Sequence, residues 1–261
     1  LEQSGWFYKI SPRLGFSHVI TDKSTFTFNY GLYYQTPVYQ SIYLNTNRLE
    51  DPEDLFEEGE GQVGNATMSA ERTQDYSVAF NVQVGESWAY SFGAWVRDMD
   101  QMTRFTHERS GVYSYQISTN GDYGSARGLD LTLEWRRAFF GSQLQYTYSI
   151  SKANSEYAWA SISGQYVDAP SQEFITYFDR PHGLTYYAYT FLPFGIQAGL
   201  TASYRSGYPY TPIIFRGKDL VEDDRNRNSK RGPGNKNLNI SLSKYFKAMN
   251  HKIALGLNVF N

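Results

Sequence analysis

Apolar and polar residues alternate along much of the chain, and the stretch STFTFNYGLYYQ (24–35) shows the pattern clearly. One side of it carries Phe26, Phe28, Tyr30, Leu32 and Tyr34, and the other carries Thr25, Thr27, Asn29 and Gly31. Because alternate residues of a strand share a face, this pattern predicts a strand with one apolar side. Further strands are predicted over residues 9–20, 76–84, 88–98, 128–137, 142–151, 182–192, 196–207, 238–246 and 252–260.

The connections between these ten predicted strands alternate in length. Short ones lie at 21–23, 85–87, 139–141, 193–195 and 248–250, and long ones span about 35–70, 101–123, 153–180 and 207–235. Every second connection therefore lies at the same end of the sheet. Short periplasmic turns and long extracellular loops are typical of an antiparallel transmembrane β-barrel. Most of the predicted strands are also about as long as the ~9–11 residues that a tilted membrane strand needs.

Composition is consistent with this class and excludes others. Aromatic residues make up 17% of the 261 residues, and aromatic side chains favour strands. No apolar run approaches the ~20 residues of a membrane helix. The formal net charge of −2 gives no electrostatic reason to expect nucleic acid as a partner, and the chain contains no cysteine for a disulfide or a thiolate metal site.

The positions of the aromatic residues indicate what the apolar faces contact. Trp88 and Trp135 lie near short turns, and Tyr34 lies near a long loop, whereas Leu129 and Leu131 lie between such ends. Aromatic residues at both interfaces and aliphatic residues at mid-span are typical of lipid-facing strands. We therefore expect lipid against the apolar faces. The alternative is the core of a soluble β-sandwich.

Five stretches of the chain carry a resemblance to a known family when they are taken in order. They are SPRLGFSHVITDKSTFTFNYGLYYQTP, GSARGLDLTLEWRR, FDRPHGL, YRSGYPYTP and RGPGNKNLNISLSKYF. Together they resemble the C-terminal barrel portion of TonB-dependent outer-membrane receptors, particularly the branch with a carboxypeptidase-regulatory-like N-terminal domain. The resemblance implies a location in the bacterial outer membrane, a barrel of the 22-strand type, a plug domain inside it, and a TonB-type energising protein in the periplasm. We expect residues 1–261 to form part of such a barrel, with the plug and the last strand outside this chain.

Five residues are candidate contacts with a ligand or with the plug. Trp95, Arg97 and Arg205 are expected on the polar face near the outer end of the barrel. Arg13 and Arg136 are expected on the same face, nearer the periplasm. Polar side chains that line a barrel contact either substrate or plug, and the sequence leaves both alternatives open.

Two other stretches carry candidate chemistry. In FDRPHGL, Pro181 suits the first position of a strand, and Arg180 is expected to pair with Asp179 or with a lipid phosphate. The acidic stretch 50–61 carries seven carboxylates, but its spacing does not match a calcium loop of the EF-hand type, so a solvated loop is the default. The four histidines are scattered and predict no metal site.

The leading functional hypothesis is a segment of a TonB-dependent transporter that takes up an unidentified nutrient. One alternative is an outer-membrane barrel that does not transport and instead serves as a scaffold for partner subunits, and another is a soluble β-rich binding module. Outer-membrane lipid, the plug, the energising protein, and a surface lipoprotein or other subunits are the partners considered. No nucleophile with a neighbouring base is evident, so neither an enzyme nor a cofactor is expected.

Overall fold

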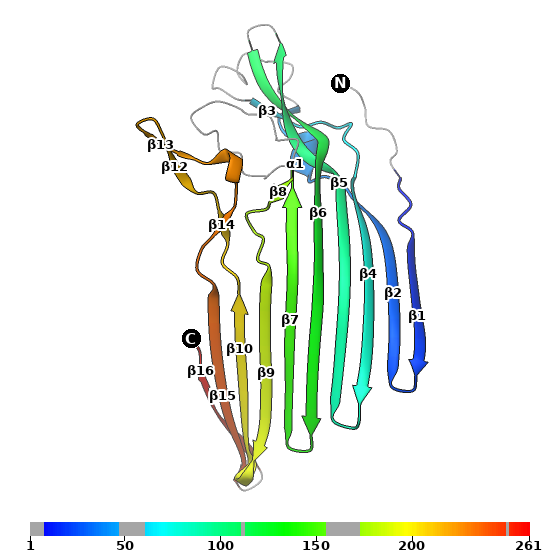
Figure 1. Ribbon diagram of the computed structural model, residues 1–261, viewed down its shortest axis with the longest axis vertical. Coiled ribbons are helices and arrows are strands. Elements are labelled where there is room, and N and C mark those ends of the chain that lie inside the picture. The colour runs from blue at the N-terminus through cyan, green and yellow to red at the C-terminus, as the bar shows by residue number, and fades with distance from the viewer. Residues whose placement is uncertain (1–7, 47–60, 111–112, 155–172, 249–250) are drawn as a thin grey trace.

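The computed structural model describes residues 8–46, 61–110, 113–154, 173–248 and 251–261. Its main feature is one antiparallel sheet in which ten strands pair with their neighbours in chain order (Figure 1). They are β1 (Arg13–Thr21), β2 (Ser24–Gln35), β4 (Glu71–Val84), β5 (Trp88–Ser110), β6 (Tyr113–Arg137), β7 (Phe140–Ala153), β9 (His182–Leu192), β10 (Ile196–Arg205), β15 (Asn235–Ala248) and β16 (His251–Val259). The ten predicted strands and their antiparallel order are confirmed.

The two ends of the sheet differ as predicted. Short turns join neighbouring strands at the lower end in Figure 1, and most of the long connections leave the upper end. Gly85 and Gly195 have positive φ values of 61° and 71° in two of these turns, a conformation that glycine adopts without steric cost. The sheet is open, with β1 and β16 at its two ends.

The minor elements lie mostly at the end with the long connections (Figure 1). They are α1 (Tyr39–Tyr43), β3 (Gly61–Val63), β8 (Phe174–Ile175), η3 (Pro193–Gly195), β11 (Pro209–Tyr210), β12 (Ile213–Arg216), β13 (Asp219–Glu222), η4 (Asp224–Asn226) and β14 (Lys230–Arg231). β3 pairs in parallel with β6, whereas β11 pairs with β14, and β12 with β13, in separate two-stranded sheets. Within the described ranges, no helix is long and apolar enough to cross a membrane.

The segment 101–123 differs from the prediction of a long connection. β5 extends to Ser110 and β6 begins at Tyr113, and the two strands are paired along these residues, with a bulge between Met99 and Thr103 that interrupts the register. Gln101 has a positive φ of 57° at this bulge. The side-chain amide of Asn120 donates hydrogen bonds to the carbonyl oxygens of Gln101 (2.7 Å) and Ser69 (3.0 Å), which ties the bulge to the connection before β4.

Strand register separates the side chains into an apolar and a polar face. Leu131 is paired with Phe92 and Tyr146 on the apolar face. The next residue, Thr132, is paired with Ser91 and Gln145 on the polar face. Leu129 and Phe92 are 43% and 46% exposed, and in the described part of the chain no second sheet packs over them. The apolar face is thus not the core of a sandwich.

Register also determines the facing of β9, which the sequence leaves uncertain. Tyr187 is paired with Gln143 and Thr201 on the polar face, whereas Tyr186 is paired with Leu144 and Ala202 on the apolar face. Tyr189 and Phe191 follow Tyr187 on the polar side, and ring contacts join the three, with centroids 6.0 Å and 5.8 Å apart. β9 therefore exposes aromatic rings on both faces.

Candidate functional site

A cluster of charged and aromatic side chains covers the polar face of β1, β2, β4, β5 and β6. Arg97 on β5 is paired in register with Asp75 on β4, and its Nη2 and Nε lie 2.6 Å and 2.8 Å from Asp75 Oδ2. The guanidinium also lies 5.8 Å from the ring centre of Trp95. The predicted neighbours Trp95 and Arg97 are thus brought together, with Asp75 as a carboxylate partner.

Arg13 belongs to the same cluster, which corrects its predicted position. The first strand runs toward the short turn at 21–23, so Arg13 lies at the end of β1 nearest the long connections and not near the short turns. Register places Arg13 beside Gly31, which is itself paired with Asp75. The Arg13 guanidinium lies 4.7 Å from the ring centre of Tyr33, and that ring lies back over Gly31.

Trp95 is fixed flat against the sheet by its neighbours on β6 and β7. Its indole N–H donates to Asp130 Oδ2 at 3.0 Å, and the Thr147 hydroxyl donates to Asp130 Oδ1 at 2.6 Å. A Cβ added to Gly128, its partner across the strands, would lie 2.6 Å from the indole ring. Glycine at this position therefore gives the ring its space.

The other two candidate residues lie apart from this cluster. Arg205 is the last residue of β10 and is exposed on the polar face, paired in register with Gly183 and Asn235. In the described part of the chain it makes no ion pair. Arg136 lies near the short turn after β6, where it pairs with Glu134 at 3.1 Å. The candidate residues therefore form one cluster and two separate positions.

Asp130 is expected to hold Trp95 in place. Asp130→Ala removes both hydrogen bonds to the carboxylate and should lower the free energy of unfolding by about 1–2 kcal/mol, because hydrogen bonds to charged groups are stronger than neutral ones but these groups are only half-buried. Urea titration of the full-length protein measures the loss. Thr132→Ala, one position further along the same face, is the control, and an equal loss there would contradict the assignment.

A second cluster, here called the clasp, consists of Ser151, Asp179 and Arg231. It joins the upper ends of β7, β9, β10 and β14. Asp179, which is 3% exposed, accepts a hydrogen bond from the Ser151 amide at 2.7 Å and pairs with the guanidinium of Arg231. Arg231 Nη1 also donates to the Asp179 carbonyl at 2.8 Å. The clasp therefore links segments that are far apart in the sequence.

Of the two partners predicted for Arg180, Asp179 is wrong, and a lipid phosphate stays a prediction. Its Nε donates to the carbonyl oxygen of Ser206 at 2.7 Å, and its guanidinium lies 4.7 Å from the ring centre of Tyr208. Neither contact involves Asp179. Ser206 also pairs with the backbone of His182 at the start of β9, so the predicted role of FDRPHGL in anchoring a strand is retained with different partners.

No metal centre is formed by the described residues, because no three His, Cys, Asp or Glu side chains among them are placed to hold an ion. Residues 50–60 of the acidic stretch, which is expected to be a solvated loop, lie outside the described residues. The ring of His182 stacks on that of Tyr146 and makes a tilted contact with that of Tyr148, and its Nδ1 lies 2.8 Å from the Tyr146 hydroxyl. These contacts give His182 a structural role.

The family model described as TonB dependent receptor-like, beta-barrel matches residues 3–261. The chain belongs to this family. Its members are receptors and transporters of the outer membrane of Gram-negative bacteria, which is therefore the location of this TonB-dependent receptor barrel. No curated protein matches the chain. The particular branch suggested by the sequence stays a prediction.

Solved structures of TonB-dependent transporters share the fold. The outer membrane transporter YddB from Escherichia coli superposes with a TM-score of 0.70 and 13% identity, over 90% of this chain and 34% of YddB. The ferric enterobactin receptor PfeA (a G324V mutant) from Pseudomonas aeruginosa superposes with a TM-score of 0.64 and 13% identity, over 96% of this chain and 34% of PfeA. The FrpB iron transporter from Neisseria meningitidis superposes with a TM-score of 0.60 and 12% identity, over 95% of this chain and 34% of FrpB. The chain thus spans about a third of each of these proteins.

In a TonB-dependent receptor barrel the apolar face contacts lipid and the polar face lines the lumen. The cluster around Arg97 therefore lies on the luminal wall toward the extracellular side, and the clasp lies at the roots of extracellular loops. Sequence reasoning did not select Tyr33, Asp75 or Asp130 as site residues. Alternation places all three on the polar face, but the ion pair and ring contacts depend on strand register.

Proposed function

We propose that this chain is part of a transporter that takes up a nutrient ligand through a plugged barrel, driven by a TonB-type protein in the periplasm. The family match over residues 3–261 carries this proposal. The structural neighbours of this chain include an iron transporter, a siderophore receptor and a copper transporter. In this chain, residues 1–261 would supply part of the wall, and a plug domain would close the lumen.

The luminal cluster would act as an intermediate contact for a ligand that enters from outside. It combines the guanidinium groups of Arg13 and Arg97 with the ring of Trp95 and with the exposed ring of Tyr33. Planar guanidinium groups bind carboxylate and phosphate groups well and also stack on rings. Because Asp75 holds Arg97 in place, the cluster is preorganised and a ligand need not order it.

The two separate arginines would have different roles. Arg205 makes no ion pair with a described residue and lies at the extracellular end of β10, so it is the better candidate for direct contact with ligand. Arg136 is paired with Glu134 near the periplasmic turn, where Gln143 also donates to Glu134 at 2.9 Å. This position fits a contact with the plug. A surface lipoprotein remains a further candidate partner at the extracellular loops.

Uptake can be tested without knowing the ligand. The full-length protein is expressed in a Gram-negative host with or without its TonB-type protein, and compounds lost from a complex growth medium are quantified by mass spectrometry. We expect at least one compound to be depleted only when both proteins are present. If no depletion depends on the receptor, or if depletion persists without the energising protein, energised transport is refuted. A result in which no depletion depends on the receptor would favour the scaffold alternative.

A further inference from the structure

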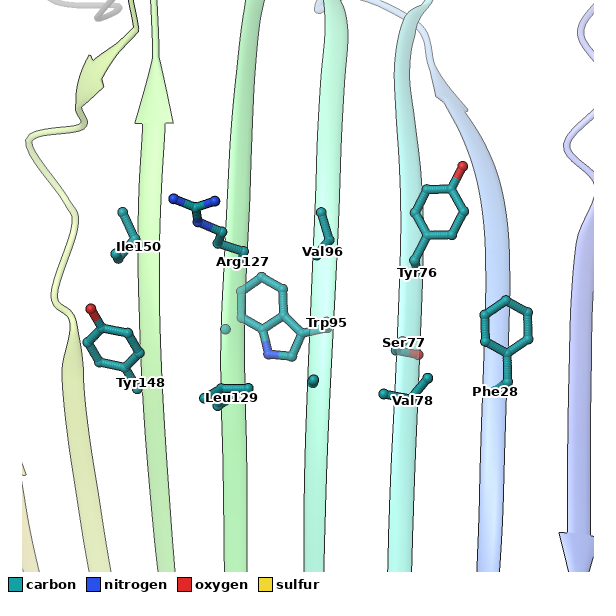
Figure 2. Close-up of a pocket in the computed structure, with 12 residues that line it drawn as sticks. Phe28, Tyr76, Ser77, Val78, Trp95, Val96, Arg127, Leu129, Tyr148 and Ile150 are labelled. Carbon is teal, nitrogen blue, oxygen red and sulfur yellow. The ribbon is translucent and has the colours of Figure 1, made fainter.

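The lipid-facing side of the sheet carries a groove of about 410 Å³ across β2, β4, β5, β6 and β7 (Figure 2). Its floor is Ala94, which is paired in register with Val78 and Leu129. Large side chains surround this small one, and a hollow results. The lining includes Phe28, Tyr76, Val78, Leu129, Tyr148 and Ile150.

A single cation lines the groove at its extracellular end. Arg127 faces lipid because it is paired with Val96 and Ile150, and Figure 2 shows its guanidinium on the side of Ile150. The hydroxyl groups of Tyr76 and Tyr148 point toward the same end of the groove (Figure 2). Tyr76 lies in the same row as Val96 and Arg127, and tyrosine near a membrane interface has its hydroxyl among head groups and its ring among acyl chains.

Arg127 has no anionic partner within the described part of the chain. The charged groups around it on this face include Asp98 and Lys152, both paired with Ser125 in the next row outward, and Glu173, whose Oε2 accepts a hydrogen bond from the Ser125 hydroxyl at 3.2 Å. None of the three forms an ion pair with Arg127. A guanidinium among apolar side chains at a membrane surface is stabilised when its side chain reaches an anion in the head-group layer.

We propose that this groove binds a phosphate-bearing lipid of the outer leaflet, with an acyl chain over Ala94 and the phosphate on Arg127. Three observations favour this occupant. The hollow lies on the face that contacts lipid, its lining is almost entirely apolar, and its one cation lies at the end nearest the head groups. Arginine also matches phosphate geometry with two parallel hydrogen bonds. The site does not depend on the transport proposal.

The test uses the full-length receptor, stripped of lipid in detergent, and measures binding by native mass spectrometry. The probes are lipid A with two phosphates and lipid A from which the phosphates have been removed. Arg127→Gln should weaken binding of the phosphorylated probe about fivefold, the effect of one basic residue at an anionic membrane surface, and leave the other probe unchanged. Arg127→Lys should retain part of the affinity.

Two further arms identify the source of the anion and the role of the groove. Ala94→Phe and Ala94→Leu fill the hollow and should weaken binding of both probes, whereas excess inorganic phosphate should displace neither. Arg137→Gln is the matched control, because Arg137 is an exposed, lipid-facing arginine at the opposite end of β6. Equal weakening by Arg127→Gln and Arg137→Gln, unchanged binding in both Ala94 variants, or displacement by inorganic phosphate would overturn the proposal.

Discussion

Arg231→Gln is expected to lower the free energy that holds the clasp closed by about 3–5 kcal/mol, because it leaves the buried carboxylate of Asp179 without its charged partner. The Asp179 side chain is only 2% exposed and the Arg231 side chain 29%, so water screens the pair weakly. The amide of Ser151 reports the change directly, since it donates to Asp179 Oδ1. Hydrogen exchange at this amide should accelerate strongly in the variant.

Matched variants separate the ion pair from a general effect of losing charge in this loop. Lys230→Gln removes a neighbouring exposed cation and should leave exchange at Ser151 unchanged. The double variant Asp179→Asn with Arg231→Gln removes both charges and should recover part of the loss, because no buried charge is left unpaired. If the double variant is less stable than Arg231→Gln by as much as Asp179→Asn alone costs, the two side chains do not interact. Loss of the ion pair would then not explain the effect of Arg231→Gln.

The clasp also bears on how ligand-capturing loops are held. Arg231 lies in the connection between β10 and β15, and Asp179 lies in the connection between β7 and β9. Asn228 adds a third link, since its side-chain amide donates to the carbonyl of Ile175 at 2.7 Å. Two loop roots are thereby fixed to one another. Loops on rigid roots lose less conformational freedom when they bind a ligand.

The sequence predicts strands well because the two faces of these strands meet different environments. Where one face contacts lipid, every second residue must be apolar, and the resulting alternation locates strands such as 24–35 and sets the facing of Leu131 and Thr132. Beyond the membrane this constraint ends. In the extension of β5 beyond the bulge, polar residues occupy both faces, so the sequence shows no clear alternation there. On β6 the stretch YSYQIS (113–118) does alternate and could have indicated the paired strand.

Contacts between distant segments could not be read from alternation. Asp75 and Arg97 are 22 residues apart, and Asp179 and Arg231 are 52 residues apart, so each pair depends on the register of strands or the path of loops. The position of Arg13 along its strand could have been predicted correctly, because the direction of the first strand follows from its short turn at 21–23. The sequence thus predicts which face of the sheet a residue occupies more reliably than it predicts which residue that side chain contacts.

Leu131→Arg is expected to destabilise the barrel by about 2–4 kcal/mol, which is the cost of placing an arginine on the lipid face near the bilayer midplane. Register places Leu131 between Phe92 and Tyr146 on the apolar face, four residues from Trp135 at the end of β6 nearest the short turn. The guanidinium at this depth has to reach a head group or bring water into the bilayer. Urea titration of the full-length protein in lipid vesicles measures the free energy of unfolding.

Thr132→Arg is the matched control, since it adds the same side chain to the next residue of the same strand. Thr132 is paired with Ser91 and Gln145 on the luminal face, where an arginine keeps contact with water and polar groups. Its cost should be much smaller than that of Leu131→Arg. The difference should also fall when the membrane is replaced by a small detergent micelle, because head groups and water then lie closer to the side chain. Equal costs at the two sites in vesicles would show that the apolar face does not contact acyl chains, and the assignment of the lumen would have to be reversed.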